Sequence, residues 1–485
     1  MGIVFKQSFN NLVITYIGFA IGAMNTLFLY ARFLTDTYYG LVSVILATSA
    51  ILMPLLAFGV PNTLIKFYSG FSDSRSQNGF LFIMLVLPLA LIIPIAGISF
   101  VANEFIGNFL GQRNIIVKDY VWHIFLIGLA MAYFEVFYSW SRIHMKSVFG
   151  NFMKEIFVRV GVSILLFLVY FQMISVDTFL QSLVGLYLLR TIIMKLYAYS
   201  LKWPSLNFAI PKNIRSILTY SFLIILGGSS AVILLEIDRF MINQFIEIEK
   251  VAYYTVAVFI ATVISVPSRA MHQITYPMTA ALLNQGDTKG LAVLYQKSSL
   301  TLFIVSGLLF VLIVLNLNDL YLLLPETYRG GFSIVFLIGL AKLFDALLGN
   351  NNAILYNSDY YKAILILGVF LAACTILFNW ALIPRIGILG AALATFLAIF
   401  IYNILKLIYV KQKFDLQPFS TDSFKVMGLL ILISTVFYFI QFPFHPILNI
   451  VLKSILICIV YIGILYRFKI SEDVFGILSK FLGPK

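Results

Sequence analysis

Apolar stretches of about 20 residues, the length that a helix needs to cross a bilayer, recur from one end of this chain to the other. The composition agrees, because 61% of the 485 residues are hydrophobic and 11% are charged. Soluble domains are about half apolar and a quarter charged. Membrane β-barrels show shorter, alternating strands of roughly 10 residues. The sequence therefore predicts an all-α polytopic membrane protein.

Fourteen segments qualify as membrane helices. They run over residues 8–31, 39–65, 80–101, 120–141, 153–173, 178–200, 216–246, 251–283, 291–315, 332–356, 361–383, 387–411, 424–442 and 447–467. The connectors are too short for a soluble domain. Only Lys6 precedes the first segment as a charge, and no small-residue cleavage site follows it, so we expect a retained first helix.

Basic residues are distributed unevenly between the two sides that these segments define. With the N-terminus in the cytoplasm, 23 Lys and Arg fall on the inner side, 7 on the outer side, and Arg159, Lys342 and Lys453 lie within helices. Inner loops of membrane proteins are enriched in Lys and Arg. We therefore predict that both termini are cytoplasmic, and the net charge of +13 needs no nucleic-acid partner.

The chain shows signs of an internal repeat. Residues 32–44 and 244–256 align without gaps, each with an apolar exit, an acidic hairpin, a small residue and a new apolar run. An even number of helices per half gives parallel repeats. The predicted domains are an N-terminal six-helix bundle (1–200), a basic cytoplasmic linker (201–215), a C-terminal six-helix bundle (216–413), and two additional helices with a cytoplasmic tail (414–485).

Three local patterns resemble one superfamily. They are the hairpin at 32–41, the run Asp238-Arg239-Phe240-Met241-Ile242 with the later Tyr253-Tyr254, and the turn and small residues at 382–395. With fourteen helices in two halves, the chain resembles the multidrug/oligosaccharidyl-lipid/polysaccharide (MOP) exporter superfamily over residues 1–412. Within it, the chain is similar to polysaccharide biosynthesis proteins and Wzx-type O-antigen flippases.

The resemblance implies two bundles that face a central cavity and provide alternating access. It also implies transfer of a polyprenyl-diphosphate-linked oligosaccharide across the bacterial inner membrane, for lipopolysaccharide or other surface polysaccharide assembly. The expected partners are membrane lipid and the lipid-linked oligosaccharide, with polysaccharide assembly proteins as candidates. The transport unit is expected to be a monomer.

Lys342 and Asp345 straddle the midpoint of segment 332–356. A charge in a membrane helix costs a few kcal/mol, so it usually faces a cavity or a partner. At i and i+3 these two residues share a helical face. They are predicted to form a cavity cation for the diphosphate with its counter-ion, or alternatively a structural ion pair.

Glu236, Asp238 and Arg239 lie about 30 Å from the inner start of their helix, near the outer boundary. Glu236 and Arg239 share a face, and Asp238 points elsewhere. The three residues could form an outer gate or a protonatable site. The alternative is an interfacial charge cluster on a long helix.

Further cations lie toward the inner side. Arg142 follows Glu135 at i+7 on the same face, and the other candidate cations are Arg159, Arg269 and Lys66. Together these cations predict a basic inner vestibule for a diphosphate headgroup, whereas each alone would also fit a snorkelling side chain. Glu135, Asp238 and Asp345 are candidate carriers of a coupling ion, H⁺ or Na⁺.

The triplet Asn350-Asn351-Asn352 closes segment 332–356. Its amides could bind sugar hydroxyls or simply end the helix, and we favour the second interpretation.

The sequence carries no catalytic signature. Its four histidines are scattered, HExxH and Walker A motifs are absent, and Cys374 and Cys458 lie alone. We therefore predict a transporter without enzyme activity, metal or cofactor. The alternatives are a cation-coupled multidrug exporter, whose cavity would be rich in carboxylates and aromatics, and a membrane-embedded polysaccharide polymerase or acyltransferase. A polymerase usually has a large outer loop and an acyltransferase an intramembrane His, and both are missing.

Overall fold

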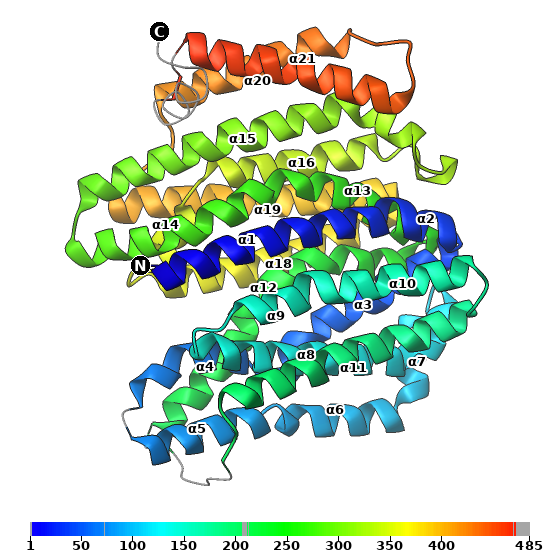
Figure 1. Cartoon of the computed structure of the whole chain (residues 1–485), viewed down its shortest axis with the longest axis vertical. Coiled ribbons are helices and arrows are strands. Elements are labelled where there is room, and N and C mark those ends of the chain that lie inside the picture. The colour runs from blue at the N-terminus through cyan, green and yellow to red at the C-terminus, as the bar shows by residue number, and fades with distance from the viewer. Residues whose placement is uncertain (1, 72, 206–210, 212, 469, 472–485) are drawn as a thin grey trace. The chain divides into compact units, whose positions relative to one another are not determined.

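The protein is described by a computed structural model that covers residues 2–71, 73–205, 211, 213–468 and 470–471. Within these ranges every regular element is a helix and no strand is present (Figure 1). The predicted all-α class is therefore confirmed. The predicted linker (201–215) and C-terminal tail fall partly outside the described residues.

The helices follow one another with short connectors. In chain order the α-helices are α1 (Gly2–Ala23), α2 (Tyr30–Phe33), α3 (Asp36–Leu56), α4 (Val60–Phe67), α5 (Ser74–Val86), α6 (Leu89–Val101), α7 (Asn103–Leu110), α8 (Val121–Ile143), α9 (Val148–Phe152), α10 (Val158–Tyr170), α11 (Val176–Leu201), α12 (Ile214–Phe245), α13 (Glu249–Thr262), α14 (Val266–Gln285), α15 (Thr288–Leu322), α16 (Phe332–Leu347), α17 (Asn351–Tyr356), α18 (Tyr361–Ile386), α19 (Ile388–Phe414), α20 (Thr421–Tyr438) and α21 (Pro446–Arg467). Two π-helices interrupt the series, η1 (Met24–Leu29) and η4 (Met153–Phe157).

Each of the fourteen predicted segments contains helix. Eleven helical stretches in the described chain are long and apolar enough to cross a membrane. The predicted segments outside these eleven contain α10, which follows a π-helix, α12, and the broken pair α16 and α17. The protein is thus a multi-pass helical protein, and the number of fourteen spans remains a prediction.

Packing divides the chain into two compact units. Unit 1 comprises Met1–Thr255 with Ile383–Gly387, and unit 2 comprises Val256–Leu382 with Ile388–Lys485. Helix α12 packs against α3 and α4 and so belongs to unit 1 by its contacts. The predicted bundles, whose second half starts at residue 216, describe a sequence repeat and remain a prediction.

In unit 1, helix α8 occupies the centre and packs against α3, α4 and α11. Trp140 and Phe134 of α8 are buried in one cluster with Leu64 and Met194. Burial of such large side chains stabilises a helical core by about 1.5–3 kcal/mol each in water. In a bilayer, close packing itself contributes more of the stability.

The two hairpins that align in sequence lie in contact within unit 1. Thr37 donates a hydrogen bond to Glu249 (2.6 Å), and the Tyr253 hydroxyl donates to Asp36 (2.8 Å). A Cβ atom at Gly40 would overlap the carbonyl oxygen of Ile248, so only glycine permits this approach. The pairing joins α12 and α13 to α3.

In unit 2, helix α15 is the common partner of α14, α16, α20 and α21. The Tyr461 hydroxyl of α21 donates to the Ile304 carbonyl of α15 (2.9 Å), and both residues are buried in one apolar cluster. Helix α15 is 35 residues long, and Asp287 caps its start by accepting from Gly290 N–H (2.8 Å). The last two helices are therefore held to unit 2 along α15.

Candidate functional site

Unit 1 encloses a cavity of about 280 Å³ that contains two of the predicted site residues, Glu236 and Arg239. Polar and aromatic side chains from η1, α2, α3, α11, α12 and α13 line it together with apolar ones. The lining residues are Thr26, Tyr30, Tyr39, Val42, Ser43, Leu46, Ala47, Ala50, Met131, Tyr187, Glu236, Arg239 and Thr255. Ala47 and Met131 lie near the middle of α3 and α8, so the cavity reaches the middle of those helices.

Glu236 and Arg239, which the i, i+3 spacing places on one face of α12, form an ion pair. The Arg239 Nε atom also donates to the Thr255 hydroxyl at 3.1 Å. The side chains of Arg239 and Glu236 are 18% and 24% exposed, so both charges are partly accessible from the cavity. An ion pair with residual solvent access can exchange its partner for a charged ligand, which a fully enclosed pair cannot do without a large desolvation cost.

Asp238 points away from this pair, as the helical spacing predicts. It is 4% exposed and accepts a hydrogen bond from the buried Tyr254 hydroxyl of α13. The lining residues of the cavity do not include Asp238. A role of Asp238 as an ion carrier is therefore a proposal that would require opening of the α12–α13 contact.

Three tyrosines form an aromatic wall of the cavity. The rings of Tyr30 and Tyr39 stack with centroids 4.9 Å apart, and Tyr187 also lines the space. The Tyr39 hydroxyl donates to the Thr26 carbonyl (3.0 Å) inside the π-helix η1. A π-helical turn widens the helix and often lies at a functional site. Here it orients the tyrosine that stands beside the ion pair.

A second group of charges in unit 1 surrounds Glu135. Its carboxylate pairs with Lys154 Nζ (2.6 Å), which η4 supplies from another part of the sequence. The expected neighbour Arg142 contributes only a longer-range attraction, because its guanidinium lies over the Tyr138 ring and donates to Ser139 (2.7 Å). Contact between helices therefore supplies a closer cation than Arg142, which the spacing places on the same face as Glu135.

Arg159 and Lys66 occupy separate surroundings in unit 1. Arg159 lies 3.0 Å from the Glu155 carboxylate, and its carbonyl accepts from the buried Asn25 side chain (2.8 Å). Lys66 is exposed, with its Nζ 3.9 Å from the Tyr220 ring centroid. In unit 2, Arg269 is exposed on α14. A shared inner vestibule for Arg142, Arg159, Arg269 and Lys66 remains a prediction.

Unit 2 holds a different ion pair. The Asp345 carboxylate lies 3.5 Å from Lys406 Nζ of α19, and this amine also donates to the Asn352 side chain (3.0 Å). The Lys406 side chain is 1% exposed, whereas that of Asp345 is 44% exposed. The spacing on α16 predicts Asp345 as the counter-ion of Lys342, and the structure places a cation from a neighbouring helix, Lys406, beside Asp345.

The asparagine triplet lies at the break between α16 and α17. Asn350 and Asn351 are buried, and they donate to the hydroxyls of Thr279 and Tyr295. The triplet does follow the end of α16, as favoured, but its amides also tie α17 to α14 and α15. Burial of Asn350 and Asn351 within the protein leaves little room for the alternative of sugar binding.

Three buried or paired cations are not predicted as site residues: Lys154, Arg190 and Lys406. In the sequence each is only one of the inner-side charges. Arg190 is 6% exposed and lies between the rings of Phe134 and Tyr187, at 4.0 and 4.8 Å from their centroids. A cation near the end of an apolar segment looks the same in sequence whether it faces water or a neighbouring helix, so no local signal distinguished them.

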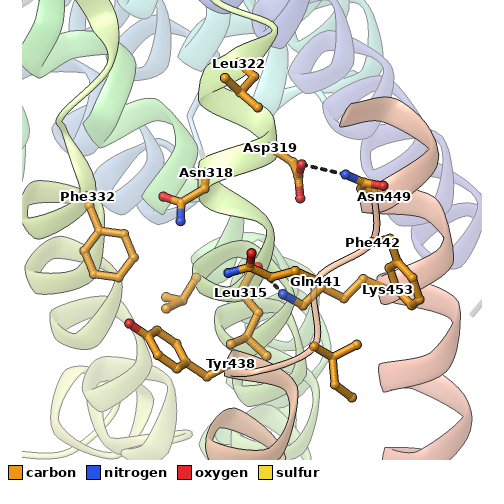
Figure 2. Close-up of a pocket in the computed structure, with 12 residues that line it drawn as sticks. Leu315, Asn318, Asp319, Leu322, Phe332, Tyr438, Gln441, Phe442, Asn449 and Lys453 are labelled. Atoms are coloured by element: carbon orange, nitrogen blue, oxygen red, sulfur yellow. Dashed lines mark hydrogen bonds between the residues drawn. The ribbon is translucent and has the colours of Figure 1, made fainter. Parts of the chain in front are cut away.

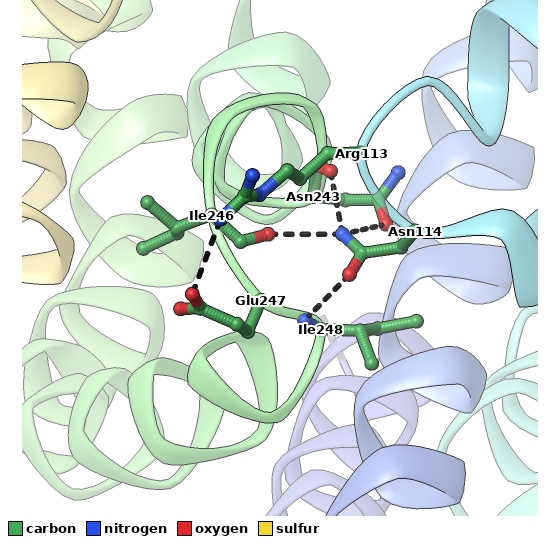
Figure 3. A network of polar contacts seen from close by, with 6 residues as sticks. All are labelled: Arg113, Asn114, Asn243, Ile246, Glu247 and Ile248. Carbon is green, nitrogen blue, oxygen red and sulfur yellow. Dashed lines mark hydrogen bonds and ion pairs between the residues drawn. The ribbon is translucent and has the colours of Figure 1, made fainter.

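A polar network fixes the C-terminal end of α12 in unit 1 (Figure 3). Asn114 donates to the Asn243 and Ile246 carbonyls (2.8 and 2.9 Å) and accepts from Ile248 N–H (3.0 Å). Nearby, Arg113 pairs with Glu247 at 3.3 Å. The pKa of Glu247 lies below its ordinary value, first because its own backbone N–H donates to it and then because of Arg113. The network holds the helix that supplies Glu236 and Arg239.

Comparison with known proteins identifies the family. A family model described as polysaccharide biosynthesis protein matches residues 4–283, more than half of the chain. An uncharacterized membrane protein of Methanocaldococcus jannaschii, MJ1068, is 24% identical over 470 residues, which cover 90% of this chain and 89% of that protein.

Solved transporters have the same fold. The lipid II flippase MurJ in an inward closed conformation matches with a TM-score of 0.74 and 16% identity, over 95% of this chain and 99% of its own. A multidrug resistance MATE family transporter of the MOP superfamily, in an inward-facing conformation, matches with a TM-score of 0.61 and 14% identity, over 84% and 98%. By its family match the chain belongs to the polysaccharide biosynthesis protein family, and its fold is that of the MOP-superfamily transporters.

Proposed function

We propose that this protein is a flippase that moves a polyprenyl-diphosphate-linked oligosaccharide across the cytoplasmic membrane by alternating access, with both termini in the cytoplasm. The observation that carries the proposal is the unit 1 cavity, in which Arg239 presents a partly accessible cation beside three tyrosines. A guanidinium is the side chain best suited to a diphosphate. Aromatic faces suit the apolar sides of sugar rings.

In this mechanism Glu236 holds Arg239 in place until the diphosphate arrives. The diphosphate then takes over the guanidinium, and Glu236 is left to accept a proton or to face water in the cavity. Exchange of one anionic partner for another avoids leaving a buried charge alone. The lipid tail stays in the bilayer, so the cavity needs to hold only the polar headgroup.

The exposed cations Lys66 and Arg269 are proposed to attract the headgroup from the cytoplasmic side, with Arg142 and Arg159 deeper in unit 1. Lys342 is proposed to follow the headgroup in unit 2. Energy coupling is assigned to a carboxylate that can change its protonation or bind Na⁺. Asp345 is the strongest candidate, because it is partly exposed while its partner Lys406 is fixed and buried. Glu135 is the second, held by Lys154.

Transport is tested in vesicles that contain the purified protein and a fluorescent polyprenyl-diphosphate oligosaccharide. A membrane-impermeant quencher added outside reports how much substrate reaches the outer leaflet. We expect Arg239→Ala to slow flipping by about tenfold or more, since a charge-assisted bond contributes about 1.5–3 kcal/mol. Arg239→Lys should retain part of the rate, because a lysine keeps the charge but not the bidentate geometry.

The matched control is Arg329→Ala, which removes the arginine from an exposed i, i+3 pair with Glu326 in a connector. This control should flip at the wild-type rate. Unchanged flipping by Arg239→Ala, with the variant folded as judged by its melting temperature, would contradict the proposed role of the cavity. Absence of flipping by the wild-type protein under every ion gradient would contradict the flippase assignment itself.

A second candidate is a cation-coupled multidrug exporter. The same cavity favours it in part, because Glu236 and three tyrosines could bind a lipophilic cation. Energised vesicles that accumulate or expel a cationic dye would support this function, and Glu236→Gln should then abolish transport while Arg239→Ala should not. The opposite ranking of the two variants supports the flippase.

A further inference from the structure

Unit 2 contains a second polar pocket, whose lining includes none of the predicted site residues and none of the residues that line the unit 1 cavity. Its volume is about 280 Å³. The C-terminal end of α15, the start of α16, the end of α20 and the start of α21 surround it, so all of its walls lie at one end of the unit 2 helices. The lining residues are Val314, Leu315, Asn318, Asp319, Leu322, Phe332, Tyr438, Ile440, Gln441, Phe442, Asn449 and Lys453.

The interior side of the pocket is a fixed polar framework. Lys453 is 6% exposed and donates to the Leu315 carbonyl at 3.0 Å (Figure 2). Asn449 is 7% exposed and donates to Asp319 at 3.1 Å, while its own oxygen accepts from Phe444 N–H at 3.2 Å. Asp319 also attracts Lys453 electrostatically. These contacts hold one carboxylate and one ammonium in defined positions.

The open side of the pocket carries polar side chains that can both donate and accept hydrogen bonds. Figure 2 shows the side chains of Asn318, Gln441 and Tyr438 turned toward one space from three different segments. Within the described part of the chain, the side-chain amides of Asn318 and Gln441 have no hydrogen-bond partner. Phe332 and Phe442 add aromatic surface to the same pocket. An amide can donate and accept at once, as a sugar hydroxyl also does.

The chemistry selects among ligand classes. A phosphate or another anion would meet the Asp319 carboxylate, and a divalent cation would meet the Lys453 ammonium. The opposite charges of Asp319 and Lys453 leave the pocket without a net charge, so the pocket favours an uncharged ligand. Paired donors and acceptors beside aromatic rings suit a polyhydroxylated ring, with polar edges and apolar faces. The volume lies near the lower end of ligand pockets, about 300 Å³, and suits a small ligand of one or two rings.

We propose that this pocket binds one or two uncharged sugar residues of a glycan. The predicted topology places it at the outer end of unit 2, since α15 and α20 would run outward and α16 and α21 inward. The pocket would then contact the sugar portion after the headgroup has crossed. The inference takes its substrate class from the proposed function, although its geometry lies entirely within unit 2.

The test uses the purified full chain and measures binding of soluble probes by titration calorimetry or ligand-observed NMR. The probes are methyl glycosides and uncharged disaccharides, with sugar phosphates and glycerol phosphate as charged comparisons. The variant Asn318→Ala/Gln441→Ala removes both amides from the open side without disturbing the Lys453 and Asn449 contacts. We expect an uncharged probe to bind the wild type and its affinity for the variant to fall about tenfold, as for loss of one or two hydrogen bonds.

The matched control, Asn284→Ala/Gln412→Ala, removes the same two amide types from exposed positions elsewhere in unit 2. Its affinity should equal that of the wild type. Three results would each overturn the inference. The pocket variant could bind the uncharged probe as tightly as the wild type, the wild type could bind no uncharged probe, or a phosphorylated probe could bind more tightly than its parent sugar. The last result would assign the pocket to an anionic headgroup.

The vesicle assay separates the two hypotheses. If the wild type flips the substrate and the pocket variant binds glycan as tightly as the wild type, the sugar-pocket inference is overturned and the proposed function is not. If the wild type binds glycan but does not flip the substrate, and the pocket variant loses this binding, the proposed function is overturned and the sugar-pocket inference is not.

Discussion

The two units each contain an acid–base pair within their helices, and the pairs differ in how they are built. In unit 1, Glu236 and Arg239 are three residues apart on α12, and both contact a cavity. In unit 2, Asp345 and Lys406 come from α16 and α19, and the lysine is enclosed. A pair on one helix is fixed by local geometry, whereas a pair between helices depends on their packing. The first can release its partner into a cavity, and the second holds two helices together.

The largest expected loss of stability comes from Gly349, which lies at the break between α16 and α17, near the Asp345–Lys406 pair of unit 2. Gly349 has φ of +52°, and a Cβ there would lie 2.6 Å from Ser299 N. We expect Gly349→Ala to lower the free energy of unfolding by about 3 kcal/mol, from left-handed strain and overpacking together. The melting temperature in detergent measures this.

Gly387→Ala is the control for backbone strain alone. Gly387 also has positive φ, +62°, but a Cβ there would meet no described atom within 4 Å. Gly387→Ala should lower the free energy of unfolding by about 1–2 kcal/mol. Equal losses at both glycines would show that the close contact with Ser299 contributes nothing.

The next largest loss of stability is expected from breaking the Asp345–Lys406 pair. Asp345→Ala leaves Lys406 buried with Asn352 as its remaining side-chain acceptor, and because Asp345 is itself 44% exposed we expect a loss of about 2 kcal/mol, less than for a fully buried pair. The double variant Asp345→Ala/Lys406→Met should recover most of this loss. Lys411→Ala, which breaks the exposed pair between Lys411 at the end of α19 and Asp415 just beyond it, should cost less than about 1 kcal/mol. A single Asp345 variant as stable as the Lys411 variant would remove the distinction between the two pairs.

A smaller loss of stability is expected from the corresponding change in unit 1. Arg239→Ala leaves Glu236 beside a cavity where water can solvate it, so we expect a cost of about 1 kcal/mol, much of it from the lost bond to Thr255. The melting temperature should change little while flipping slows. A loss as large as that of Asp345→Ala would mean that the unit 1 pair is structural, which would contradict its proposed exchange with a ligand.

The smallest effect comes from a purely local contact outside the membrane segments. The pKa of Asp73 lies below its ordinary value, because the backbone N–H groups of Ser76 and Arg75 donate to its carboxylate at the start of α5. A depressed pKa in the folded state stabilises the protein above the ordinary pKa of an aspartate, about 3.9, and this contribution is lost as the pH falls through the folded value. Asp73→Ala should therefore be slightly less stable at pH 7, and the difference should become smaller in acid, where only the neutral carboxyl oxygen remains as an acceptor. A difference that is the same at both pH values would mean that the charge plays no part.

The predicted features that agree with the structure are those set by neighbouring residues. The apolar segments coincide with helices, Glu236 and Arg239 share a face of α12, and Asp238 points away from them. The contact between the hairpins at 32–44 and 244–256 was not predicted, because it joins residues that lie far apart in the sequence. The ion pair between Glu135 and Lys154 was not predicted, because nothing in the spacing reveals that η4 brings this lysine to the carboxylate.

Helical structure, membrane-spanning segments and a resemblance to the polysaccharide biosynthesis family could be predicted from the sequence alone, because hydropathy, segment length and turn residues act within a few residues of one another. Which charges face a cavity and which are enclosed depends on how the helices pack. Rotation and depth of each helix place Lys406 inside unit 2 and Arg239 beside a cavity in unit 1, although both look in sequence like cations near a helix end. The free energy of a charge in a membrane depends on that placement, and so does its capacity to bind a ligand.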